Sequence, residues 1–165
     1  MIECAETIRD KALIAVLYEG GFRIEELLNR RLGDVIFDAN GAKVRVNGKT
    51  GPRIVRLITS VSLLARWIEQ HPFRGKNRYA LWASFSRESK GQQLEYHCKP
   101  ILLKSAATCA GVGERIYPHL FKHSAATRDA HFLTEAQLRI KFGWSRFSTM
   151  SALYVHLAAV MWIRR

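Results

Sequence analysis

The sequence predicts an α+β domain that is mostly helical and carries a small three-stranded antiparallel sheet near its N-terminus. Apolar residues recur at helical spacing over most of the chain, whereas between Gly33 and Ile58 they recur at every second position. The chain has 165 residues, of which 48% are hydrophobic, and this is enough for one ordinary core. We therefore expect residues 1–165 to form a single domain.

A pair of glycines near the start of the chain separates two expected helices. The first spans residues 6–19, and the second begins at Ile24 and ends near Arg31. Arg23 stands at the mouth of the sharp turn between them. Its side chain is therefore expected to be aimed in one direction rather than left free in solvent.

Three short strands are expected next, over about residues 35–37, 44–46 and 54–57. Turn sequences rich in Asn, Asp and Gly separate them, as in antiparallel hairpins. Lys49 lies at the tip of the second turn, between two glycines that leave the loop free to move. Pro52 has no backbone N–H to donate and suits an edge strand.

The rest of the chain is expected to be helical, apart from a polar loop over residues 73–93. Capping residues, glycines and prolines mark the helix ends. The expected helices run from Ser60 to before Pro72, from about Tyr96 to Ala110, from Pro118 through Ala126, from Thr134 through Phe142, and from Ser148 onward.

Basic residues outnumber acidic ones by 26 to 14, which gives a formal net charge of +12 and an isoelectric point near 10.1. So large an excess attracts polyanions, and double-stranded DNA is the expected partner. Several cations in predicted loops and turns are candidates for diffuse contacts to phosphates. They are Arg74, Lys76, Arg78, Arg87, Lys90 and Arg146.

The acidic residues are scattered along the sequence, without the carboxylate cluster that holds Mg²⁺ in metal-dependent nucleases. His119 and His123 have zinc-binding spacing, but the sequence between them lacks the glutamate of the H-E-x-x-H motif. We therefore expect no metal and no cofactor.

The three cysteines, Cys4, Cys98 and Cys109, are widely spaced, and the longest apolar run, residues 12–18, is too short to span a bilayer. The first residues include acids where a signal peptide would carry basic residues. These features favour a soluble protein with reduced thiols in the cytoplasm.

Six side chains form a candidate set for phosphoryl transfer. A phosphodiester in its transition state carries charge on its nonbridging oxygens, and it needs a nucleophile in line with a leaving oxygen that receives a proton. Cations and a phenol can supply these functions. The set is Arg23, Lys49, His119, Lys122, Trp144 and Tyr154.

Five sequence blocks around these residues resemble the catalytic domain of the tyrosine recombinases, the phage integrase family. They occur in the family's order over nearly the whole chain, and their residues most resemble those of archaeal members. The resemblance implies the fold of that domain, site-specific cleavage and rejoining of DNA, and integration or excision of a viral or other mobile element. The blocks are residues 21–28, 48–51, 118–127, 142–145 and 154–156.

The resemblance implies three principal catalytic roles. Tyr154 would attack the scissile phosphate and give a 3′-phosphotyrosyl link and a free 5′-hydroxyl, without ATP or metal. Arg23 would clamp a nonbridging oxygen with its forked guanidinium. Lys49 would be the general acid that protonates the leaving 5′-oxygen.

The resemblance also implies supporting roles. His119 would assist proton transfer or position the phosphate. Trp144 would pack on Tyr154 and donate its indole N–H. Glu26, one turn beyond Arg23, matches an acidic residue that supports the site.

Lys122 departs from the family motif H-x-x-R, in which this residue is arginine. Lysine keeps the charge but lacks the forked donors, so we expect a loss on the order of 10²- to 10³-fold in rate. The sequence leaves open whether the lysine is natural or engineered.

The sequence also allows two alternatives to an active recombinase. One is a DNA-binding module on the same fold that is impaired by Lys122. The other is a metal-dependent nuclease, which the scattered acidic residues disfavour.

The resemblance also bears on assembly. Family members carry an N-terminal helical domain that closes a clamp around the duplex, whereas this chain begins almost at the catalytic domain. The family forms homotetramers on DNA by exchanging the segment after the tyrosine. Because only residues 155–165 follow Tyr154, we expect this chain alone to be a monomer with weaker DNA binding than a complete enzyme.

Overall fold

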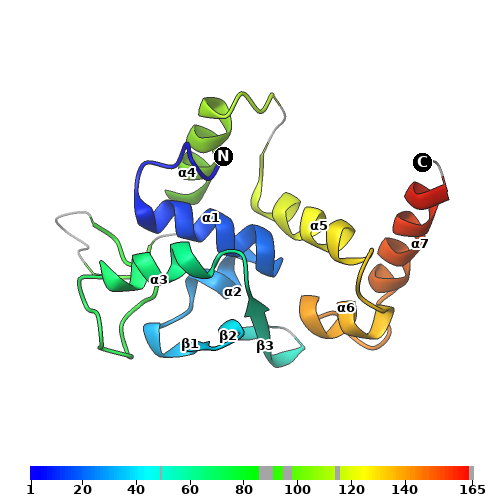
Figure 1. Ribbon diagram of the computed structural model, residues 1–165, viewed down its shortest axis with the longest axis horizontal. Helices are drawn as coiled ribbons and strands as arrows, with labels where there is room; N and C mark the ends of the chain where they lie inside the picture. Colours follow the sequence, from blue (N-terminus) through cyan, green and yellow to red (C-terminus); the bar gives the residue numbers. More distant parts are fainter. Residues whose placement is uncertain (49, 86–90, 95–97, 114–115, 164–165) are drawn as a thin grey trace.

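The computed structural model describes the chain except for residues 49, 86–90, 95–97, 114–115 and 164–165. The expected class, mostly helical with a three-stranded antiparallel sheet, is confirmed (Figure 1). In chain order the elements are α1 (Ile8–Gly20), α2 (Ile24–Leu28), the short 3₁₀ helix η1 (Leu32–Asp34), β1 (Val35–Asp38), β2 (Gly41–Gly48), β3 (Gly51–Leu57), α3 (Val61–Glu69), α4 (Cys98–Cys109), α5 (Pro118–Asp129), α6 (Glu135–Phe142) and α7 (Met150–Ile163).

The three strands form one sheet in the order β1-β2-β3, and both pairs are antiparallel. Val44 in β2 stands opposite Val55 in β3. Ala42, Val44 and Val46 are buried, whereas the residues between them are more exposed, as expected for a sheet with one face on the core. Pro52 lies in β3, an edge strand, as predicted.

Helix α2 is shorter than predicted and ends at Leu28. The N–H of Leu32 donates to the carbonyl of Tyr79, and the N–H of Leu81 donates to the carbonyl of Arg30. The segment after α2 therefore pairs with a distant part of the chain instead of continuing the helix. Such long-range pairing overrides local helix propensity and leaves no local signal.

A carboxylate from another helix caps the start of α3. Glu19, near the end of α1, accepts hydrogen bonds from the backbone N–H groups of Ile58, Thr59 and Ser60. Ser60 is the N-cap residue of α3, as predicted, but its hydroxyl donates to Glu19 and makes no capping hydrogen bond to the helix backbone. A negative charge at a helix N-terminus is stabilising, and here it also ties α1 to α3.

The C-terminal helices match the predicted boundaries closely. The expected start of α4 at Tyr96 lies outside the described residues. Thr134 and Gln137 form the predicted capping box of α6, and Gly143 ends that helix in the left-handed conformation. Helix α7 begins at Met150, slightly later than predicted. None of the helices in the described part of the chain is long and apolar enough to cross a membrane.

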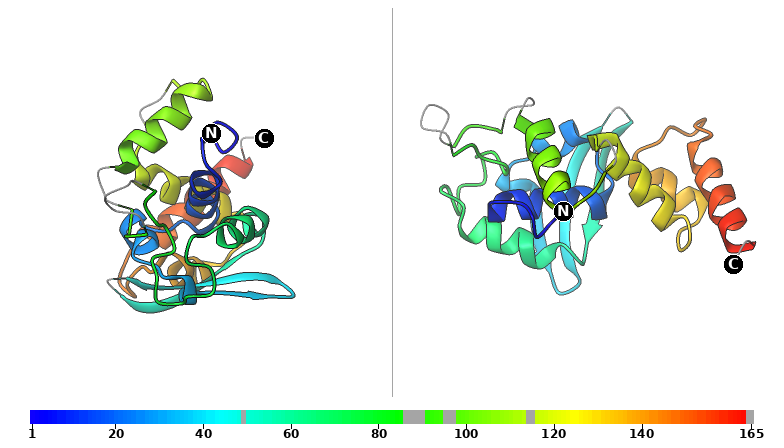
Figure 2. Two further views of the ribbon diagram at one scale, coloured as in Figure 1. Left: turned by 90° about the vertical axis from the view of Figure 1, so that its left-hand side faces the viewer. Right: turned by 90° about the horizontal axis from the view of Figure 1, so that it is seen from above.

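Two hydrophobic clusters stabilise the fold. The N-terminal cluster joins α1, α2, the sheet, α3 and part of α4, and its largest fully buried side chains are Trp67, Trp82 and Phe22. The C-terminal cluster joins α5, α6 and α7, which lie away from α3 and the loop after it (Figure 1, Figure 2). The buried members of the C-terminal cluster are Ala125, Ala126, Leu138, Phe142 and Tyr154.

Candidate active site

Arg23 is held in place at the start of α2. Its Nη1 donates to Glu26 Oε1 over 2.8 Å, and its backbone N–H donates to Glu26 Oε2 over 3.2 Å. The preceding turn contains Gly21 at φ 58°, where an added Cβ would lie 2.2 Å from the Phe142 ring. The guanidinium therefore has a fixed direction, and 30% of the side chain stays exposed.

Arg53, on β3, is a second partner of Glu26 that sequence reasoning missed. Its Nη2 donates to Glu26 Oε2 over 2.7 Å, and its Nε donates to the carbonyl of Lys141 over 3.0 Å. Gly48 and Gly143 flank the guanidinium, since a Cβ on either would lie 2.8 Å from its Nη1. Arg53 thus joins the β2–β3 hairpin, α2 and the end of α6.

Glu26 stays ionised between the two arginines. Burial by itself raises the pKa of the Glu26 carboxyl, but the hydrogen bonds and charge of Arg53, together with the hydrogen bonds from Arg23, lower this pKa to about 2. A buried carboxylate that is paired twice fixes both guanidinium groups. Its placement supports the predicted role as a residue that holds Arg23.

Lys122 is a buried cation on α5. Its Nζ donates to the carbonyl of Phe142, the last residue of α6, over 2.7 Å. Burial lowers the pKa of Lys122, the charges of Arg23 and Arg53 lower it further, and Glu26 opposes them, so that the pKa is about 7. At neutral pH this side chain therefore carries only part of a positive charge.

Three aromatic rings form a stack that ends at the tyrosine. Phe142 stacks on Trp144 with ring centroids 5.1 Å apart, and Trp144 stacks on Tyr154 at 5.5 Å with the planes only 3° apart. Thr50 donates its hydroxyl to the carbonyl of Gly143 over 3.2 Å, which holds the hairpin against the turn that carries Trp144. The predicted packing of Trp144 on Tyr154 is present.

Tyr154 is buried, with 5% of its surface exposed, and burial raises the pKa of its phenol. Its hydroxyl is hydrogen-bonded to Nδ1 of His123, a residue that the sequence suggested only as half of an incomplete zinc motif. His119, one turn earlier on α5, is exposed and has no hydrogen-bond or ion-pair partner among the residues that the structure describes. The histidine that contacts the tyrosine is thus His123 rather than His119.

Contacts link most of the predicted residues into one group. Arg23, Glu26 and Arg53 form its charged side, Lys122 lies close to these charges, and the aromatic stack forms its other side. Lys49 lies outside the described residues, although the adjacent Thr50 contacts the turn after α6. The predicted residues in this connected group are Arg23, Glu26, Lys122, Trp144 and Tyr154.

The peripheral cations lie in two places. Arg74, Lys76 and Arg78 are exposed in the loop after α3, which lies far from α7 (Figure 1). Arg146 is exposed and lines a hollow of about 260 Å³ that also includes Thr50 and Trp144. Only Arg146 therefore borders the candidate site, while Arg87 and Lys90 lie outside the described residues.

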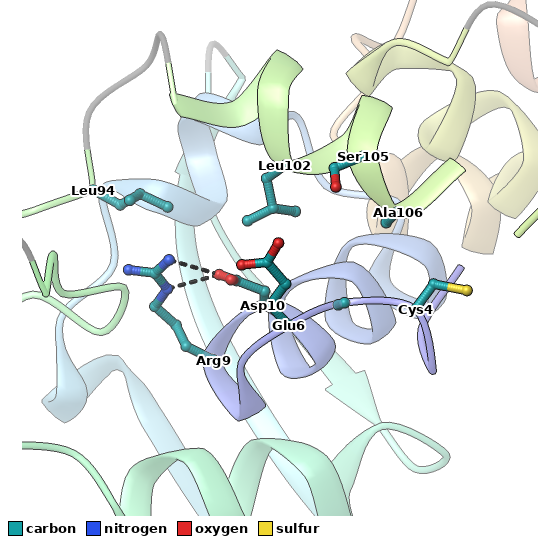
Figure 3. A pocket seen from close by; sticks show the side chains of 9 residues that line it. Cys4, Glu6, Arg9, Asp10, Leu94, Leu102, Ser105 and Ala106 are labelled. Carbon is teal, nitrogen blue, oxygen red and sulfur yellow. Dashed lines mark hydrogen bonds and ion pairs between the residues drawn. The ribbon is translucent and has the colours of Figure 1, made fainter. Parts of the chain in front are cut away.

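A separate cavity of about 220 Å³ lies between the start of α1 and α4 (Figure 3). Arg9 and Asp10 point into this region and form an ion pair of 2.7 Å, and Arg9 Nη1 also donates to the carbonyl of Ala83. These charges are already paired, which indicates a structural role. Within the described ranges, no three His, Cys, Asp or Glu side chains gather as they would around a metal ion.

Comparisons with known proteins identify the family and the fold of the chain. The sequence profile described as "Phage integrase family" matches residues 1–160. The chain is similar to tyrosine recombinase XerD of Yersinia pestis, with 32% identity over 159 residues, and to a tyrosine recombinase of Synechococcus elongatus, with 30% identity over 156 residues. Both alignments cover 92% of this chain but only 50% and 47% of the relatives, so the chain spans about half of their length.

Solved structures show the same fold. The crystal structure of XerA recombinase superposes with a TM-score of 0.75 at 20% identity, over 94% of this chain and 56% of that chain. The pre-cleavage complex of XerH site-specific recombinase with its difH substrate also gives 0.75 at 20% identity, over 98% of this chain and 49% of that chain. With a family profile that matches almost its entire length and a fold shared with these recombinases, the chain belongs to the phage integrase family.

Proposed function

We propose that this chain is the catalytic domain of a site-specific recombinase that cleaves and rejoins strands of double-stranded DNA. The observation that carries the proposal is the connected group in which a paired arginine, a buried lysine and a tryptophan-stacked tyrosine converge from distant parts of the sequence. The net charge of +12 supports a polyanionic substrate. Similar solved structures include DNA complexes of XerH and of the Tn1549 transposon integrase.

In this proposal Arg23 and Lys122 hold the scissile phosphate. Glu26 occupies one nitrogen of the Arg23 guanidinium, which leaves other donors for a nonbridging oxygen. Lys122 donates one of its three hydrogens to Phe142 and retains two when it is charged. The clamp thus combines one permanent charge with one that depends on pH.

Tyr154 is the nucleophile in this proposal. Its phenolic oxygen bonds to phosphorus, the bond from phosphorus to the 5′-oxygen breaks, and that oxygen receives a proton from Lys49 as general acid. Trp144 fixes the ring plane of Tyr154 by stacking on it. Because the 3′-phosphotyrosyl link conserves the energy of the phosphodiester, a second strand can be joined without ATP or a metal ion.

Integration or excision of a mobile element is the corresponding biological activity. One similar structure is the Tn1549 transposon integrase in complex with circular intermediate DNA. Recombination joins two duplexes, so the full assembly would be a homotetramer on DNA, with the segment after Tyr154 as the element that passes between protomers. The isolated chain would be a monomer.

The proposal is tested by trapping the covalent intermediate. The substrate is a pool of labelled, nicked duplexes with randomised inverted repeats, in which the short 5′-hydroxyl fragment diffuses away after cleavage. The expected result is a protein–DNA adduct that survives denaturant, forms in EDTA and is abolished by Tyr154→Phe. Tyr18→Phe, which alters an exposed tyrosine on α1, serves as the matched control and keeps the adduct.

The proposal is overturned if neither the wild type nor Lys122→Arg forms an adduct with any member of the pool while both bind DNA. It is equally overturned if Tyr154→Phe retains the adduct, or if strand cutting requires Mg²⁺.

A further inference from the structure

The hollow of about 260 Å³ that borders the candidate site lies between the β2–β3 hairpin and the turn after α6. Thr50 and Pro52 line it from the hairpin, and Trp144 lines it from the turn. Three arginines also line it, whereas no Asp or Glu of the described residues does. The hollow is therefore a place where positive charge gathers. The three arginines are Arg53, Arg139 and Arg146.

Two of these arginines have opposite surroundings. Arg53 has 6% of its side chain exposed, and it donates to Glu26 and to the carbonyl of Lys141. It contributes charge to the hollow, but most of its donors are already in use. Arg146 is exposed and forms no hydrogen bond or ion pair with the described residues. Its whole guanidinium therefore remains for a ligand.

Arg139, on α6, connects the hollow to helix α7. Its Nη2 pairs with Glu135, one turn earlier, and donates to the Ser151 hydroxyl over 3.4 Å. Ser151 is fully buried and lies one turn before Tyr154 on α7. The Nε of Arg139 is buried and has no hydrogen-bond partner among the described residues. One side chain thus borders the hollow, contacts the helix that carries Tyr154 and keeps unused donors.

The size and the lining of the hollow fit one phosphate group. Guanidinium groups bind phosphate oxygens through parallel N–H donors, and this geometry is specific to arginine. The volume equals that of roughly nine water molecules at about 30 Å³ each, and it is smaller than the usual range of about 300–1,000 Å³ for sites that enclose an organic ligand. A phosphate can therefore enter while the rest of its molecule stays outside.

The hollow lies one aromatic ring away from the proposed nucleophile. Trp144 lines the hollow and stacks on Tyr154, with ring centroids 5.5 Å apart. A DNA strand carries one phosphate about every 3.4 Å along the helix axis. When one phosphate of a strand is placed at Tyr154, its neighbours on the same strand are therefore within reach of the hollow.

We propose that the hollow is a second phosphate site, in which Arg139 and Arg146 bind one uncleaved phosphodiester of the strand that Tyr154 attacks. This inference rests on the proposed function. The strand is then held at two points, the scissile phosphate and a neighbour, and this fixes its register relative to the phenol. Because Arg139 also contacts Ser151, the bound strand and the start of α7 share one side chain.

The test is a scan with methylphosphonates, which carry a methyl group in place of one nonbridging oxygen and therefore no charge. Each phosphate near the nick is replaced in turn, in a duplex from which the wild type, or Lys122→Arg, forms the adduct. We expect one uncleaved position at which the replacement slows adduct formation on the order of 10-fold. In Arg146→Gln this position should become insensitive, while the other positions keep their effects.

Further variants separate the forked donors from charge alone. Arg146→Lys keeps the charge but lacks the fork, so it should retain part of the sensitivity at that position. Arg139→Gln should lose the sensitivity, as Arg146→Gln does, and the urea midpoint checks that each variant is folded. Arg66→Gln, which alters an exposed arginine on α3, is the matched control and keeps the full pattern.

Three outcomes overturn the inference while the proposed function stands. A scan that is unchanged in Arg146→Gln and Arg139→Gln would show that the hollow binds no backbone phosphate. Equal slowing at every position in Arg146→Gln would reduce Arg146 to diffuse attraction. Inhibition by inorganic phosphate that requires Arg146, without a sensitive position in the scan, would identify a site for free phosphate. Failure of the parent protein to form any adduct would instead overturn the proposed function, and this inference with it.

Discussion

The N-terminal and C-terminal hydrophobic clusters support the candidate site from two sides, and they differ in their relation to its chemistry. Among the described residues, the N-terminal cluster includes none of the predicted site residues, although Arg23 and Glu26 lie on elements that it holds. The C-terminal cluster is smaller and counts Tyr154 among its buried members. The proposed phosphate clamp therefore rests on a separate core, whereas the proposed nucleophile, Tyr154, is itself part of the packing.

The two clusters are joined by polar contacts rather than by a continuous apolar interface. Arg53 links Glu26 to the carbonyl of Lys141, and Thr50 links the hairpin to Gly143. Arg128 of α5 adds hydrogen bonds to carbonyl groups at the end of α1. The relative placement of Arg23 and Tyr154 thus depends in part on a few directional contacts. Substitutions at this junction test whether these contacts hold the two clusters together.

The largest expected effect is that of Lys122→Arg, at the boundary between the two clusters. Arginine keeps its charge at every relevant pH and offers forked donors, so adduct formation should accelerate on the order of 10²- to 10³-fold. The measurement is the single-turnover rate of adduct formation on a nicked duplex. Lys141→Arg, where the lysine pairs with Asp129 instead, is the control and should change the rate little. An unchanged or slower rate of adduct formation in Lys122→Arg would contradict the expectation that lysine is the weaker residue at this position.

The next effect concerns the link between the clusters. Arg53→Met leaves Glu26 buried with one partner, so the free energy of unfolding should fall by about 3 kcal/mol. The urea midpoint measures this loss. Arg56→Met removes an exposed ion pair with Asp38 from the same strand and should have little effect. Equal losses in the two variants would mean that Arg53 does not bridge the clusters.

The smallest expected effect is a pH dependence of stability from Lys122. The folded state releases this proton near pH 7, whereas an unfolded lysine holds it to about pH 10.4. The unfolded state therefore binds more protons in this range, and the free energy of unfolding should rise with pH, by at most about 1.4 kcal/mol per pH unit. Urea titrations from pH 7.5 to 9.5 measure this slope. The slope should disappear in Lys122→Met and persist in Lys141→Met.

Local sequence patterns were enough to predict most of the helices and the sheet, whereas the candidate site residues were grouped by their chemistry and by the family resemblance. Glycine turns, capping residues and alternating strands act over a few neighbours and place Arg23 at a turn, whereas Trp144 and Tyr154 were selected by the order of the family's sequence blocks. The burial of Lys122 and Tyr154 could not be predicted, because it results from packing between α5, α6 and α7.

The two missed residues show where sequence signals exist and where they do not. Arg53, Val55 and Leu57 occupy every second position of β3, so Arg53 lies on the same inner face of the strand as the two apolar residues. The two-residue period of the strand was therefore a usable signal. His123 gave no such signal, since its contact with Tyr154 requires two helices that are distant in sequence to pack together.

The turn before Arg23 has a consequence for the whole site. Gly21 leaves space for the Phe142 ring, and Phe142 begins the stack that leads to Tyr154. A Cβ at position 21 would displace the Phe142 ring, and the rings of Trp144 and Tyr154 stacked beyond it would have to shift as well. One missing carbon beside the guanidinium of Arg23 is thus felt, through three rings, at the phenol of Tyr154.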